Sequence, residues 1–163
     1  MKFSRYSIYY VPDGLLGNFG ATWFGWDIQA REFVPNLEIQ NDKVDLKKLT
    51  EGAWKYGFHG TLKAPFHLKS CRNEKELVED FEDFCRNQPS VCSEKLVVKT
   101  INNFLALVPQ KQSEGINQLA QNCVTFFDQY RAPINKKELS RRLSKALTSY
   151  QREMLSKWGY PYV

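Results

Sequence analysis

A chain of 163 residues is long enough for one domain with a hydrophobic core and short for two. Hydrophobic residues make up 42% and charged residues 25%, a composition that is ordinary for a folded protein. The net charge of +5 favours an anionic ligand but is mild for a polyanion-binding protein. No stretch approaches the roughly 20 apolar residues of a membrane span, and MKFSRYSIYYVP lacks the features of a signal peptide, so we expect no membrane partner and a cytoplasmic location.

The first part of the chain predicts a strand, a short helix and a long connection. Residues 5–11, RYSIYYV, are aromatic and β-branched and end at Pro12, which indicates a strand. Residues 15–24 predict a short helix that turns three side chains inward: Leu16, Phe19 and Trp23. Residues 26–56 predict a surface connection with a turn capped by Asp45.

Residues 56–68, YGFHGTLKAPFHL, predict the next strand. Side chains two positions apart in a strand share a face, so His59, Thr61 and Lys63 are expected to point together. Pro65 indicates a sheet edge, a bulge or the end of the strand.

Three helices with recognisable caps are predicted in the second half, starting at Asn73, Ser113 and Asn135. The last is expected to be the longest and to end at Gly159. Between the first two, KLVVKT and FLALVP flank Asn102-Asn103, which predicts a hairpin. The order of elements favours an α+β fold with an antiparallel sheet and flanking helices.

The sequence contains only two histidines, both in residues 56–68. An imidazole at His59 can move a proton, and a hydroxyl at Thr61 can donate a hydrogen bond to a phosphoryl oxygen. Lys63 could add positive charge beside the same oxygen. A short H-x-T also arises by chance, so its residues could equally be structural. His67 lies beyond Pro65 and is interpreted as a surface or packing residue.

Four cysteines occur without a C-x-x-C pair, and with two histidines they offer no common zinc spacing. We therefore expect reduced thiols and no metal site. The cysteines are Cys71, Cys85, Cys92 and Cys123.

The peptides YSIYYVP and YGFHGTLKAPF, followed by FLALVP, FDQYRAP and WGYPYV, resemble the 2H phosphoesterase superfamily and most closely its domain-of-unknown-function family 1045. The resemblance implies a bilobal α+β fold in which two facing strands each carry one H-x-[ST], and it implies metal-free acid/base chemistry without a cofactor. By position, His59 would be an acid/base and Thr61 a phosphoryl donor. Tyr9 would stack on the substrate, although a core aromatic is an equal interpretation.

The resemblance implies a small phosphorylated substrate, a phosphodiester or cyclic phosphate of a sugar or nucleotide, because members are often linked to phosphonate metabolism. The second H-x-[ST] is missing before Val163. We therefore expect residues 1–163 to form a single domain that is C-terminally truncated relative to the family, with its second lobe incomplete, or else a natural short form. The alternative function is an inactive form that only binds a phosphorylated ligand.

An incomplete lobe would expose apolar helix faces, for which we expect Leu143, Leu147 and Trp158. Pairing of two chains in a homodimer, which would cover those faces and bring a second His59, is one hypothesis; a monomer in sedimentation would exclude it.

Two basic features remain. Arg131 could bind phosphate or fix the turn between two helices, the latter being favoured. A basic run in the last predicted helix could contact RNA, but a solvated helix face is the favoured interpretation. The run consists of Lys136, Lys137, Arg141, Arg142 and Lys145.

Overall fold

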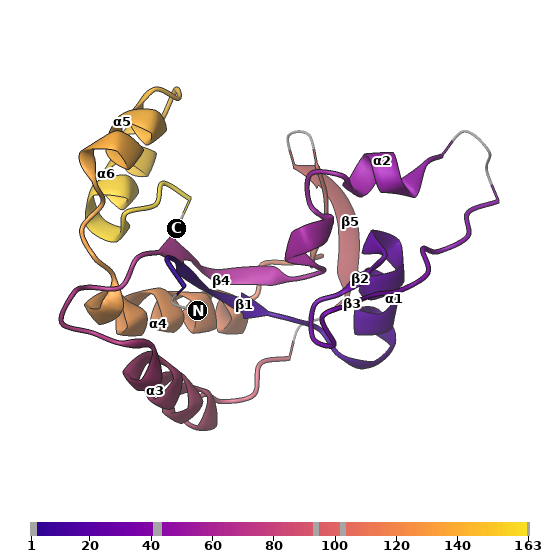
Figure 1. Cartoon of the computed structure of the whole chain (residues 1–163), viewed down its shortest axis with the longest axis horizontal. Helices are drawn as coiled ribbons and strands as arrows, with labels where there is room; N and C mark the ends of the chain where they lie inside the picture. The colour runs from indigo at the N-terminus through magenta and orange to yellow at the C-terminus, as the bar shows by residue number, and fades with distance from the viewer. Residues whose placement is uncertain (1–2, 41–43, 93–94, 102–103, 163) are drawn as a thin grey trace. The chain divides into compact units, whose positions relative to one another are not determined.

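The computed structural model describes residues 3–40, 44–92, 95–101 and 104–162. It has a mixed α+β fold with short antiparallel sheets between helices, which confirms the predicted class (Figure 1). The chain divides into two compact units: unit 1 comprises Met1–Ser7 and Leu62–Val163, and unit 2 comprises Ile8–Thr61. The expectation of a single domain stays a prediction.

The strands β1 (Tyr6–Tyr10) and β4 (Gly60–Phe66) pair in a two-stranded sheet, and each strand is divided between the two units. Both strands were predicted, although His59 lies directly before β4 instead of within it. Pro65 lies in β4. Because a two-stranded sheet has only edge strands, the missing amide hydrogen of this proline is tolerated there, as its sequence position indicated.

Unit 2 contains the helix α1 (Gly14–Phe24), whose buried residue is Gly20. A Cβ atom on Gly20 would lie 2.2 Å from the ring of Phe58, so this glycine lets α1 approach the segment before β4 closely. The prediction that Phe19 turns inward is wrong, since 44% of that residue is exposed. The helix packs through its glycine face because a glycine removes the bulk between two backbones.

The expectation that residues 26–56 form a plain surface connection is wrong. They contain the short hairpin β2 (Trp26–Asp27) and β3 (Glu32–Phe33), the helix α2 (Leu46–Thr50) and the 3₁₀ helix η1 (Trp54–Tyr56). Trp26, Phe33 and Trp54 contact one another with ring centroids 5.1–5.9 Å apart. The elements that carry these rings are only two or three residues long, too short for a periodic apolar pattern, so periodicity did not reveal them. Asp45 caps α2 as predicted, accepting from the Lys48 amide.

The core of unit 1 lies between α3 (Glu74–Arg86) and α4 (Glu114–Phe126), which continues into the 3₁₀ helix η2 (Phe127–Tyr130). The predicted caps Asn73 and Ser113 accept hydrogen bonds from the amides of Glu76 and Ile116. Phe84 contacts Phe127 with ring centroids 5.1 Å apart, and Phe127 is fully buried. The apolar stripes of α3 and α4 therefore face each other, as their periodicity indicated.

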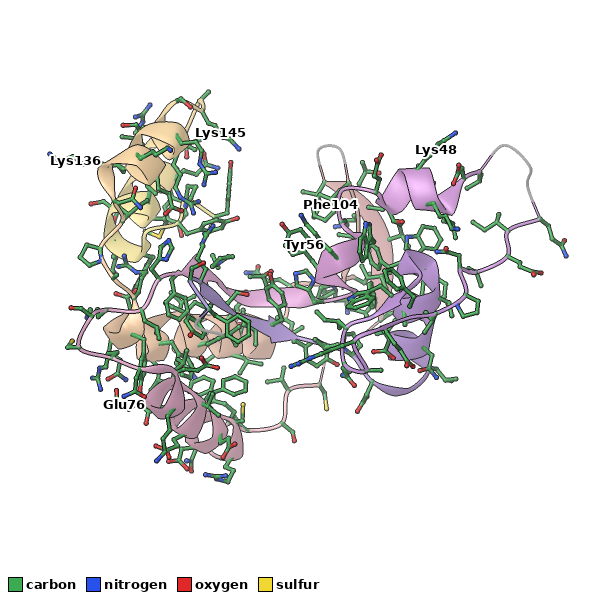
Figure 2. All side chains as sticks on the ribbon, in the orientation of Figure 1. Lys48, Tyr56, Glu76, Phe104, Lys136 and Lys145 are labelled. Atoms are coloured by element: carbon green, nitrogen blue, oxygen red, sulfur yellow. The ribbon has the colours of Figure 1, made fainter. Side chains whose placement is uncertain are left out.

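The strands β5 (Leu96–Ile101) and β6 (Phe104–Pro109) form the predicted antiparallel hairpin, while its expected turn at Asn102-Asn103 lies outside the described residues. Several of its apolar side chains are exposed, including Phe104, which Figure 2 labels. Sheets that are apolar on both faces are normally covered on both faces. This hairpin thus carries apolar surface that unit 1 does not bury.

The prediction that the last helix is a single long one is wrong. It is two helices, α5 (Lys136–Leu143) and α6 (Ser149–Trp158), as the orange and yellow ribbons of Figure 1 show. Thr148 and Gln151 form a capping box that starts α6, and this S/T-x-x-Q signal overrides the continuous apolar spacing across the break. The ends at Asn135 and Gly159 are as predicted.

The expected exposure of helix faces is wrong in part. Leu143 is 41% exposed, but Leu147 is buried and Trp158 is half-buried. Leu147 lies in the turn between α5 and α6 and is buried there. Within the described ranges, no helix combines the length and apolar character needed to cross a bilayer.

Candidate functional site

His59 and Tyr9 stack on each other within unit 2. Their ring centroids are 3.8 Å apart and their planes differ by 25°. Tyr9 comes from β1, and His59 immediately precedes β4, the strand that pairs with β1. Both side chains are half-buried. One face of the imidazole is therefore covered by an aromatic ring, while the residue stays partly open to solvent.

The backbone carbonyl of Gly57 determines which ring nitrogen of His59 carries a hydrogen. Nδ1 of His59 lies 3.0 Å from the Gly57 carbonyl oxygen. A carbonyl oxygen only accepts, so Nδ1 must carry the hydrogen and donate it. In the neutral ring this leaves Nε2 unprotonated, with a lone pair that can take up a proton. The geometry thus selects Nε2 as the reactive nitrogen of His59.

Gly57 has a backbone conformation that suits glycine. Its φ is +65°, and a Cβ atom there would lie 2.6 Å from Cβ of Ile28. Glycine adopts positive φ without steric cost, and no side chain fits beside Ile28. The carbonyl that fixes His59 is consequently placed by a residue that the H-x-T motif does not include.

Thr61 is exposed and belongs to β4, two residues beyond His59. Its hydroxyl is available at the surface of unit 2 to donate a hydrogen bond to a ligand oxygen. Tyr9, His59 and Thr61 all lie in unit 2.

Lys63 is buried in unit 1, with 4% of the residue exposed. Its ammonium donates to the Val124 carbonyl at 2.9 Å and lies 3.5 Å from Oδ1 of Asp128. Burial lowers the pKa of Lys63, against the opposing effect of Asp128. The structure therefore gives this lysine protein partners, and its contact with a substrate stays a prediction.

Arg131 shares Asp128 with Lys63. Its Nε donates to Asp128 Oδ1 at 2.7 Å, and Nη2 donates to Oδ2 at 3.2 Å and to the Lys157 carbonyl at 3.1 Å. Only 16% of the arginine side chain is exposed. The guanidinium links η2 to the last turn of α6, and its contact with a phosphate stays a prediction.

His67 and two arginines of the basic run, Arg141 and Arg142, also have protein partners. His67 is exposed and its Nδ1 contacts the Ser4 carbonyl. In the basic run, which Figure 2 marks by Lys136 and Lys145, Arg142 pairs with Glu138 at 2.6 Å and lies over the ring of Tyr160. These contacts occupy part of the charge that an RNA backbone would require.

Two pockets are lined by described residues, one in each unit. The cavity of unit 1, about 30 Å³, holds roughly one water molecule and is lined by residues that include Lys63 and Arg131. The cavity of unit 2, about 90 Å³, is lined by Phe58 beside His59 and by polar side chains. The latter are Asp13, Asn18, Asp27 and Gln29. A polar cavity therefore adjoins the segment that carries His59.

Residues 61–163, well over half of the chain, match the family described as protein of unknown function (DUF1045). The chain belongs to this family. The match begins at Thr61, so Tyr9, Gly57 and His59 precede it.

Two curated relatives of this DUF1045 chain share one name, ribose 1,5-bisphosphate phosphokinase PhnN. The protein from Janthinobacterium sp. (strain Marseille) is 36% identical over 162 residues, and that from Laribacter hongkongensis (strain HLHK9) is 27% identical over 161 residues. Both alignments cover 98% of this chain but only 36% and 37% of the relatives. The chain therefore spans little more than a third of their length. No solved structure matches it.

The four cysteines of the DUF1045 chain are free thiols: Cys71, Cys85 and Cys92 are exposed, and Cys123 is buried. Burial raises the pKa of the Cys123 thiol to about 11, so it stays protonated and unreactive near neutral pH. Within the described part of the chain, no three His, Cys, Asp or Glu side chains gather as metal ligands would.

Sequence reasoning missed Gly57 and Asp128. Gly57 stands two residues before His59, and a glycine directly ahead of a candidate catalytic segment is a signal for positive φ. Asp128 stands three residues before Arg131 on η2, within ion-pairing reach of it on one helical turn. Its pairing with Lys63, 65 residues away, had no sequence signal.

Proposed function

We propose that this chain is a phosphoesterase of the 2H type, which hydrolyses a phosphodiester or cyclic phosphate of a small sugar or nucleotide with His59 as its acid/base. The observation that carries the proposal is the arrangement of His59: Nδ1 is bound to the Gly57 carbonyl, so Nε2 is left to exchange protons. An exposed Thr61 hydroxyl two residues away supplies a donor for a phosphoryl oxygen.

In the proposed reaction, Nε2 of His59 takes a proton from water as the water oxygen bonds to phosphorus. Thr61 donates a hydrogen bond to a non-bridging oxygen, which accumulates negative charge. The bond from phosphorus to the leaving oxygen then breaks, and the imidazolium returns its proton to that oxygen. One histidine can serve both steps in turn; without a second imidazole, turnover is expected to be about 10²–10⁴-fold below that of a two-histidine site.

The names of the relatives describe a phosphokinase that acts on a sugar bisphosphate, which supports phosphorylated sugars as the substrate class. We do not assign the kinase reaction to this chain, since none of its nine glycines is followed by lysine, as the phosphate-cradling G-x-x-x-x-G-K-[ST] loop requires. The relatives have nearly two thirds of their length outside the matched region.

The test is hydrolysis of a panel of nucleoside and sugar cyclic phosphates in the presence of EDTA. We expect His59→Ala to lower kcat/KM by about 10²–10⁴-fold and Thr61→Ala by about 10²-fold. His67→Ala, the matched change at the other histidine, should stay within about twofold because its Nδ1 contacts a backbone carbonyl of unit 1, away from the unit 2 residues proposed to act. Equal activity of His59→Ala and the unmodified chain would refute the proposal.

The second candidate is a module that binds a phosphorylated ligand without hydrolysing it. The exposed Thr61 hydroxyl favours this function too, since binding requires only a donor. Absence of turnover, together with calorimetric binding of a cyclic phosphate that Thr61→Ala weakens, would select the module.

A further inference from the structure

We propose that Tyr9 is a positioning residue: its ring fixes the orientation of the His59 imidazole, so that Nε2 keeps a single direction relative to the backbone. The catalytic part of this inference rests on the proposed function. It assigns Tyr9 a role that differs from stacking on a substrate.

The contact geometry leads to this role. The two rings are nearly parallel, with planes 25° apart and centroids 3.8 Å apart, which is direct van der Waals contact. The face of Tyr9 that meets His59 is closed to a ligand. A substrate could reach only the opposite face, and the ring contact that the structure shows for Tyr9 is with His59.

Two restraints together determine where Nε2 lies. The side chain of a histidine turns about two torsion angles. The hydrogen bond from Nδ1 to the Gly57 carbonyl, 3.0 Å long, restrains the ring edge. A hydrogen bond alone permits the ring to swing about it, and the stacked face of Tyr9, with centroids 3.8 Å apart, restricts that rotation.

The chain offers a direct measurement, because its sequence has only two histidines. A long-range ¹H–¹⁵N spectrum of the full chain shows two imidazole rings, and His59→Ala assigns them by the loss of one. In the neutral ring of His59, we expect a protonated Nδ1, an unprotonated Nε2 and ring-current-shifted carbon-bound protons.

Tyr9→Leu removes the ring, and Tyr9→Phe retains it. In Tyr9→Leu, we expect the ring-current shifts to disappear and the ¹⁵N signals to move toward a mixture of tautomers. The value of kcat should fall by about 10- to 100-fold with KM within about twofold. Tyr9→Phe should restore both the spectrum and kcat, since the contact needs a ring and no hydroxyl.

The control is Tyr10→Leu, because Tyr10 is adjacent in β1, points to the opposite face and is 57% exposed. It should leave the His59 signals unchanged. Should Tyr9→Leu fail to fold by circular dichroism, Tyr9→Met supplies an unbranched apolar replacement for the same comparison.

Unchanged His59 signals in Tyr9→Leu would overturn the proposal, as would a raised KM with unchanged kcat, which would indicate substrate stacking. If the unmodified chain hydrolyses no cyclic phosphate but Tyr9→Leu scrambles the His59 signals, positioning stands and the proposed reaction fails.

Discussion

At the scale of single residues, Lys63 was predicted from its place in the sequence to contact a ligand. In the structure, its ammonium lies at the end of helix α4. Its ammonium donates to the Val124 carbonyl in the last turn of α4. Carbonyls of the last helical turn have no partner within the helix, and the helix dipole favours a cation there. Lys63 therefore joins β4 to α4 and, through Asp128, to Arg131.

We expect Lys63→Met to lower the free energy of unfolding by about 1–3 kcal/mol, because it leaves a buried carbonyl without its donor. Urea unfolding at neutral pH measures the loss. Lys48→Met is the matched control, since 83% of that lysine side chain is exposed, and its effect should stay within about 0.5 kcal/mol. Equal midpoints for the two variants would show that the Lys63 contacts contribute nothing to stability.

At the scale of elements, the carboxylate of Glu138 on α5 forms ion pairs within that helix and with Arg5. Glu138 accepts from Arg142 at 2.6 Å and lies 3.6 Å from Arg5, with 15% of its side chain exposed. Burial raises the pKa of Glu138, but the hydrogen bond and charge of Arg142, with Arg5 and Arg141, outweigh it and hold the pKa below its usual value of 4.5. The ionised form is thus stabilised by folding.

A carboxyl group whose pKa is lower in the folded than in the unfolded state stabilises the fold above the unfolded value and loses that effect as pH falls through the folded value. Glu138→Gln should therefore cost about 1 kcal/mol at pH 7, and the difference should shrink below about pH 4.5. Thermal unfolding between pH 3 and 7 measures this. Glu79→Gln, with 61% of the carboxylate side chain exposed, should show little dependence; a constant deficit for Glu138→Gln at all pH values would contradict the prediction.

At the scale of the whole molecule, apolar surface gathers on the β5–β6 hairpin. Val98 is 66% exposed, Leu105 is 63% exposed, and the register places both on one face, because Thr100 pairs with Leu105. Scattered apolar residues are normal on a protein surface, whereas a contiguous group is not. Leu15 of α1, at 91% exposed, is an exposed apolar residue of the other unit, outside the hairpin.

We expect the double change Val98→Thr and Leu105→Thr to lower the fluorescence of the dye ANS bound to the native chain by about half, because threonine keeps the strand propensity and removes apolar area. Leu15→Gln should leave the dye signal nearly unchanged. Equal dye binding by the hairpin variant and the unmodified chain would show that the exposed apolar surface lies elsewhere.

The sequence by itself determined the α+β class, the strand at the start, the strand that contains Pro65, and the helix starts at Asn73, Ser113 and Asn135, because strand composition and capping are local properties. The same local rules missed the break before α6, where the Thr148 capping box competes with apolar spacing that continues across it.

Only the tertiary structure decided what the candidate site residues contact. His59 meets Tyr9, 50 residues away, and Lys63 meets Asp128, 65 residues away. Side chains that share a predicted strand face are equivalent in sequence, but burial and pairing depend on which distant elements pack against them. For that reason Thr61 stays open to solvent while Lys63, two positions later, is enclosed.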